Sequence, residues 1–122
     1  MEQLGSYTMI IVLTILSGIA DAQGFLHAAR IWQNGSLIWV ELGRSALGFT
    51  IGIMLYWLVL RNMNAVGITS PEIQTITWFG VTLIGVALIS GSFLKWTLLD
   101  QVIAVLVLLG IGWLMFRTTV GA

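Results

Sequence analysis

The chain has 122 residues, of which 58% are hydrophobic and 8% charged, and its mean hydropathy is +1.01. Soluble domains carry about 25% charged residues, so the composition excludes an ordinary soluble domain and indicates a protein surrounded by lipid. The net charge is zero, which argues against a basic nucleic-acid-binding patch. The chain has no cysteine and a single histidine, His27. Thiolate metal sites and multi-histidine metal sites within one chain are therefore excluded. We therefore expect a membrane protein that is not an enzyme and has no metal or cofactor.

Four apolar stretches are long enough to cross a bilayer, which takes about 20 mostly apolar residues per helix. We place these spans at residues of about 7–29, 37–60, 71–94 and 99–116. Most aromatic residues fall near the span ends, where Trp and Tyr favour the interface: Tyr7, Tyr56, Trp57 and Trp113 toward the termini, and Trp32, Trp39 and Trp96 toward the other side. The prediction is one all-α domain over residues 1–122, a four-transmembrane-helix bundle with both termini on the same side.

The first span contains Asp21. A charged residue inside the bilayer is unfavourable and suggests a functional site by default. Ser17 and Gly24 share its helix face, at i−4 and i+3, and no basic residue stands three or four positions away. An aspartate there is expected to carry a proton unless water or a cation reaches it. The alternative is that the helix ends near Ala20 and that Asp21 is interfacial. The residues before the apolar run include Glu2 and no Lys or Arg, so we expect an uncleaved helix rather than a signal peptide.

The second span follows a turn predicted at residues 34–36, which read Asn-Gly-Ser. Glu41 and Arg44 lie three positions apart in its first turns and can pair on one helix face. They form either an interfacial ion pair or the charged wall of a cavity. Gly48 and Gly52 form a GxxxG pattern, which lets helix backbones approach closely.

The third span has the clearest beginning. A turn is predicted at residues 61–64; Ser70 can then cap the helix, Pro71 suits its first position, and Glu72 faces the positive end of the helix dipole. Trp78 lies seven residues in, about 10 Å deep at 1.5 Å per residue. It either packs against lipid and neighbouring helices or lines a site.

The basic residues hardly distinguish the two sides of the bundle. Arg61 and Arg117 lie on the terminal side, and Arg30 and Lys95 lie on the other, where Arg44 can also reach. The positive-inside rule therefore assigns no orientation. The balance reflects either a weak signal in a small protein or insertion of copies in both directions.

The layout resembles the small multidrug resistance family of the drug/metabolite transporter superfamily. Residues 16–22 resemble its Gly-x-x-acid segment, with Asp21 where the family has its essential glutamate. Residues 78–80, Trp-Phe-Gly, resemble the Trp-x-Gly of the family's third helix, although Thr75 stands where the family has a tyrosine.

The resemblance implies proton-coupled export of a small cationic or polar compound by a homodimer in the inner cell membrane of a prokaryote. In the family the two copies pair antiparallel. Asp21 from both copies would bind proton or substrate, and Trp78 would offer an aromatic face to a cation. The implied site residues are Asp21, Trp78, Ser17 and Thr75. Glu41 and Arg44 have no counterpart in the family, and their spacing alone makes them candidate cavity charges. The alternatives are a non-transporting subunit or scaffold of a larger complex, and a component of a lipid or lipid-linked sugar flippase.

Overall fold

The computed structural model describes residues 2–121 and contains four long helices and a short hairpin. The elements are α1 (Glu2–Ala28), β1 (Trp32–Gln33), β2 (Ser36–Leu37), α2 (Trp39–Ala65), α3 (Pro71–Ser90), the 3₁₀ helix η1 (Ser92–Lys95) and α4 (Leu98–Gly121). Three helices, α1, α2 and α3, are long and apolar enough to cross a membrane, and α4 contributes a shorter apolar stretch, Leu98–Leu114. The all-α prediction is confirmed, and these helices are those of a small multi-pass membrane protein.

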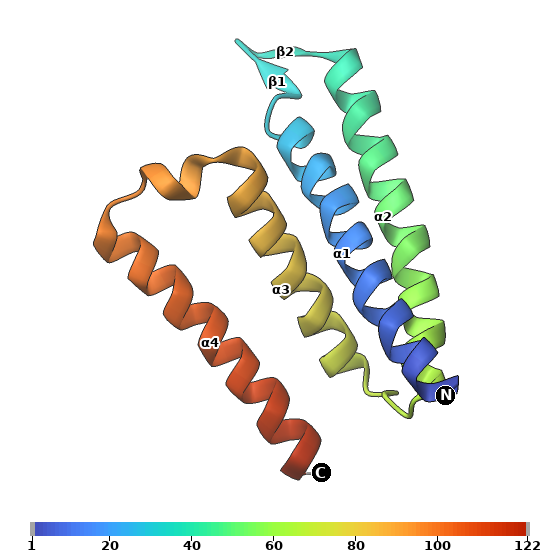
Figure 1. Cartoon of the computed structure of the whole chain (residues 1–122). Helices are drawn as coiled ribbons and strands as arrows, with labels where there is room; N and C mark the ends of the chain where they lie inside the picture. Colours follow the sequence, from blue (N-terminus) through green and yellow to red (C-terminus); the bar gives the residue numbers. More distant parts are fainter. Residues whose placement is uncertain (1, 122) are drawn as a thin grey trace.

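The helices lie side by side in an open array (Figure 1). The first helix, α1, lies between α2 and α3 and contacts both, whereas α4 contacts α3 on its far side. The beginning of α1 and the end of α4 lie at one end of the array, which we call the terminal end, and the β hairpin lies at the opposite, hairpin end (Figure 1). The array leaves many large apolar side chains exposed, as a lipid surrounding allows.

Small residues bring α1 and α2 together. An added Cβ at Gly48 would lie 2.7 Å from the backbone nitrogen of Gly24, so only glycine fits there. The Ser45 hydroxyl donates to the Gly24 carbonyl at 2.8 Å, and the Ser17 hydroxyl donates to the Gly52 carbonyl at 2.9 Å. Serine and glycine thus give close packing and interhelical hydrogen bonds where no hydrophobic effect operates between helices.

The same α1 packs against α3 through a second pair of glycines. An added Cβ at Gly85 would lie 3.2 Å from the Gly18 carbonyl oxygen, and one at Gly18 would overlap Val81. Nearer the terminal end, an apolar core cluster joins α1 to α2: Leu13, Val59 and Met63, with Ile10, Leu55, Leu60 and Ile68 packed against it. These contacts fix the positions of α2 and α3 along α1.

The α1–α2 connection is a tight hairpin. Trp32 pairs with Leu37 and Gln33 with Ser36. Between them, Asn34 has φ 53° and Gly35 has φ 77°. Positive φ at both central residues is typical of a type I′ turn, for which Asn-Gly is the preferred sequence. The turn predicted at 34–36 is therefore present.

The turn predicted at residues 61–64 is wrong. Helix α2 continues to Ala65, and the Asn62 side chain donates to the Leu58 carbonyl within the helix at 2.9 Å. The chain turns only at Gly67, whose φ of 88° suits glycine. Asparagine near a helix end is compatible with helix, whereas the left-handed residue reverses the chain.

The third helix begins as predicted but ends earlier. The Ser70 hydroxyl accepts a hydrogen bond from the Ile73 amide at 3.5 Å, and Pro71 occupies the first helical position. The helix was predicted to run to about residue 94, yet it stops at Ser90. Gly91 caps it in the left-handed conformation with φ 70°, which ends the α-helix before η1.

Candidate functional site

The carboxyl of Asp21 lies deep between the helices. Helix α1 continues to Ala28, so the alternative that it ends near Ala20 is wrong. Asp21 stands seven residues from this helix end, about 10 Å at 1.5 Å per residue. The residue is 1% exposed, and in the part of the chain that the structure describes it has no ion-pair partner. A buried carboxyl without a base can be neutralised by a proton or by a cation from outside the chain.

Three helices surround this carboxyl. From α3, Trp78 Nε1 donates a hydrogen bond to Asp21 Oδ2 at 2.5 Å. From α2, Gly52 makes room for the acid, because an added Cβ there would lie 2.6 Å from Asp21 Cγ. Ser17, one turn earlier on α1, is 1% exposed and binds the Gly52 carbonyl. The arrangement fixes the acid, to which Trp78 donates directly.

Aromatic rings hold Trp78 in place. Tyr56 stacks on it, with ring centroids 5.7 Å apart and an interplanar angle of 20°. Phe79 packs against it in a T-shaped arrangement, with ring centroids 5.0 Å apart. Sequence analysis placed Tyr56 at the interface, and the structure instead places it at the site. The sequence does carry a signal for this, because Gly48, Gly52 and Tyr56 recur every four residues on one face of α2.

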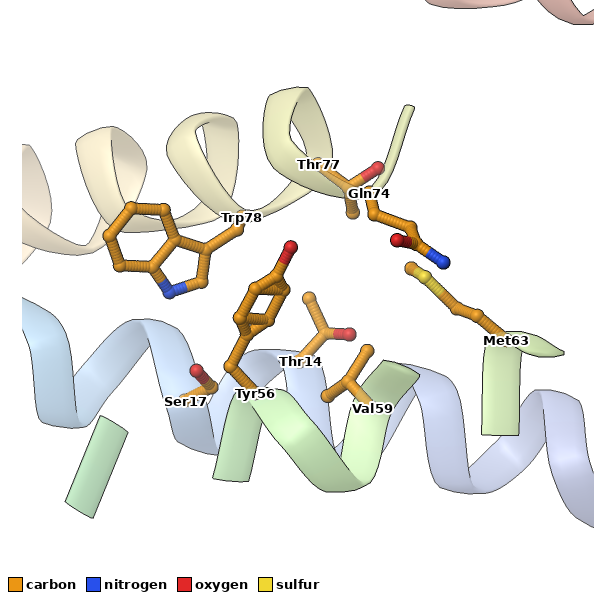
Figure 2. A pocket seen from close by; sticks show the side chains of 8 residues that line it. All are labelled: Thr14, Ser17, Tyr56, Val59, Met63, Gln74, Thr77 and Trp78. Atoms are coloured by element: carbon orange, nitrogen blue, oxygen red, sulfur yellow. The ribbon is translucent and has the colours of Figure 1, made fainter. Parts of the chain in front are cut away.

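A small cavity lies next to Ser17, Tyr56 and Trp78, and Asp21 itself does not line it (Figure 2). Its volume is about 10 Å³, close to the space that one water molecule needs. The lining residues are Thr14, Ser17, Tyr56, Val59, Met63, Gln74, Thr77 and Trp78. Tyr56 reaches across from α2 toward α3, while Thr14 and Ser17 lie on the α1 side (Figure 2). The Thr14 hydroxyl is buried and has no partner among the described residues, so the cavity offers it room for a water.

The structure brings together three of the four predicted binding residues. Asp21, Ser17 and Trp78 form one group. Thr75 is exposed and does not line the cavity, where Gln74 and Thr77 of the same helix stand instead. The hydroxyl contact that the resemblance assigns to position 75 therefore has no counterpart in this cavity.

Glu41 and Arg44 form a separate polar cluster at the hairpin end of α1 and α2. Arg44 lies 3.4 Å from Glu41 Oε1, so the two residues pair as the spacing indicates. His27 Nδ1 lies 2.6 Å from Glu41 Oε2, a contact across to α1. The side chain of Glu41 is 13% exposed and that of Arg44 is 59% exposed. This cluster does not line the small cavity, and the tight contact of Gly24 with Gly48 separates it from Asp21.

No protein-family model, curated protein or solved structure significantly matches this chain.

Proposed function

We propose that the chain is a small membrane transporter in which Asp21 alternately binds a proton and a small cationic or polar compound. The observation that carries the proposal is the Asp21 carboxyl, 1% exposed inside an apolar helix and without an ion-pair partner among the described residues. Ionisable groups in such positions are unfavourable and typically belong to proton or substrate pathways. Competition of proton and compound for one carboxyl couples their opposite fluxes.

The neighbours of Asp21 support this role. Trp78 donates to the carboxyl and can continue to do so whether a proton or a cation is bound to the other oxygen. Tyr56 covers one face of the Trp78 ring, so only the opposite face can receive a cation. Binding and release then change the charge at Asp21 while its surroundings stay ordered.

A homodimer accounts for the size of the site. The cavity next to Ser17 and Trp78 is about 10 Å³, enough for a water and too small for an organic compound. A larger site at Asp21 needs a second copy, and the helices that bury each Asp21 must part for the two carboxyls to share it. An antiparallel pair, embedded in the inner membrane of a prokaryote, agrees with the balanced Lys and Arg residues on the two sides.

Replacing Asp21 with asparagine tests the proposal. Asparagine keeps the size and accepts the hydrogen bond from Trp78, but it exchanges no proton and attracts no cation. In proteoliposomes with an internal pH dye, we expect the original chain to exchange protons for one of three probe cations, methylammonium, tetramethylammonium or choline. Asp21→Asn should reduce this exchange to the level of empty liposomes.

Asp100→Asn is the matched control, because Asp100 is an exposed acid at the beginning of α4. It should exchange protons like the original chain. Transport by Asp21→Asn at the original rate would contradict the proposal.

A non-transporting subunit is the alternative that the unpaired Asp21 also permits, since the acid could pair with a base of another protein. Crosslinking in native membranes separates the two functions. A self-crosslinked pair supports the transporter, whereas a fixed larger complex without probe exchange supports the subunit.

A further inference from the structure

A second and much larger pocket opens between α3, η1 and α4. We call it the outer pocket, and its volume is about 580 Å³, within the range of roughly 300–1,000 Å³ that small-molecule sites occupy. The lining residues are Phe25, Phe79, Thr82, Leu83, Val86, Ala87, Ser90, Ser92, Phe93 and Trp96. It is large enough to admit an organic molecule from the surrounding lipid.

The wall of the outer pocket is aromatic and uncharged. Phe25, Phe79, Phe93 and Trp96 contribute rings, and the remaining lining residues include no charged side chain. Phe93 and Trp96 pack against each other with centroids 5.5 Å apart, which fixes one side of the wall. A charged ligand would lose its hydration here without gaining a counter-charge, so these walls select a neutral, lipophilic molecule with a ring that can stack.

One polar group in the wall lacks a partner. Thr82 is 4% exposed, and its hydroxyl is buried with no hydrogen-bond partner among the described residues. Other helical threonines satisfy themselves within their helix: Thr50 donates to the Ala46 carbonyl at 2.7 Å, and Thr77 donates to the Ile73 carbonyl at 2.7 Å. The Thr82 hydroxyl is therefore unsatisfied beside an apolar pocket, and because less than 1 Å² of its oxygen is accessible, it reaches the pocket only by rotation about the Cα–Cβ bond.

We propose that the outer pocket binds an uncharged ring compound that carries a carbonyl acceptor, the chemistry of a membrane quinone. The ring would lie among the aromatic side chains, and its carbonyl would accept the hydrogen bond from Thr82 once that hydroxyl has rotated toward the pocket. A saturated acyl chain would fill the volume but leave this hydroxyl unpaired, which is unfavourable for a buried polar group. The outer pocket is distinct from the small cavity, although Phe79 borders both this pocket and Trp78, and the proposal does not depend on the proposed transport.

Quenching of tryptophan fluorescence tests this site, because Trp96 lies in its wall. The probe is 2-methyl-1,4-naphthoquinone, titrated into the full chain in lipid nanodiscs, with empty nanodiscs measuring partition into lipid. The original chain should show saturable quenching. Thr82→Val removes the hydroxyl at nearly constant shape and should weaken binding about three- to tenfold, the effect of one hydrogen bond.

Thr50→Val is the matched control, because the Thr50 hydroxyl is bonded within its own helix and the side chain is exposed. It should bind the probe within about twofold of the original chain. Ala87→Phe adds a ring inside the pocket and should abolish saturable quenching. The proposal is overturned if quenching in the original chain never saturates, if Thr82→Val binds as tightly as Thr50→Val, or if Ala87→Phe binds normally.

Discussion

Position 52 shows how one missing side chain shapes the site. Gly52 and Gly43 both belong to α2, but an added Cβ at Gly52 would lie 2.6 Å from Asp21 Cγ, whereas one at Gly43 would meet nothing within 4 Å. Overpacking a tight contact typically destabilises a protein by about 1–3 kcal/mol. Alanine in an open helical position stabilises a helix by up to about 1 kcal/mol relative to glycine.

We therefore predict opposite effects for two chemically identical substitutions. Gly52→Ala should lower the free energy of unfolding by about 1–3 kcal/mol and should displace Asp21 from Trp78. Gly43→Ala should leave stability unchanged or raise it slightly. Reversible unfolding in mixed micelles measures the stability of both variants. Equal stability of the two variants would show that Asp21 does not pack against Gly52.

At the scale of the helices, hydroxyl groups join α1 to α2. The Ser45 hydroxyl is buried, 3% exposed, and donates to the Gly24 carbonyl at 2.8 Å. Interhelical hydrogen bonds inside membranes average about 0.6 kcal/mol, with a maximum near 1.7 kcal/mol. Because Ser45→Ala removes only the oxygen, it isolates this contact.

We predict that Ser45→Ala lowers the free energy of unfolding by about 0.6–1.7 kcal/mol without changing the helix content. Ser36→Ala, in the exposed strand β2, is the control and should change stability by less than about 0.5 kcal/mol. Unfolding followed by circular dichroism measures both. A Ser45→Ala variant as stable as the Ser36→Ala control would mean that the α1–α2 contact depends on packing alone.

For the whole molecule, the arrangement of the helix ends predicts its topology. The beginning of α1 and the end of α4 lie at the terminal end, and the hairpin lies at the other (Figure 1). If the terminal and hairpin ends lie on opposite sides of a bilayer, Gly5 and Arg117 face one side and Ser36 faces the other. The chain has no cysteine, so introduced cysteines can be labelled without background.

The number of labels on paired cysteine variants tests this topology, when sealed vesicles are treated with an impermeant thiol reagent. Intact mass spectrometry should find that Gly5→Cys/Arg117→Cys molecules carry either two labels or none, whichever way each copy inserts. Gly5→Cys/Ser36→Cys molecules should carry one label each. Single labels on the first pair would show that the chain crosses the membrane an odd number of times.

The sequence by itself determined the environment and the ends of several elements. High hydropathy and few charges require a lipid surrounding, because such a chain cannot cover a surface in water. The Asn34–Gly35 turn and the Ser70 cap followed from local chemistry, since the groups that form them are neighbours in sequence. Local rules also explain the wrong turn prediction at residues 61–64, where polar residues indicated a turn although α2 continues through them.

Only the tertiary structure decided what surrounds Asp21. Its hydrogen-bond donor, Trp78 of α3, stands 57 positions away, and Gly52, which makes room for the Asp21 carboxyl, belongs to α2. The rotation of each helix about its axis selects these partners, and nearly uniform apolar helices carry little pattern that would fix that rotation. For the same reason Tyr56, which was predicted at the interface, lies at the site, and Thr75, which was predicted at the site, is exposed. Close packing at glycine contacts, which depends on two helices at once, set the final arrangement.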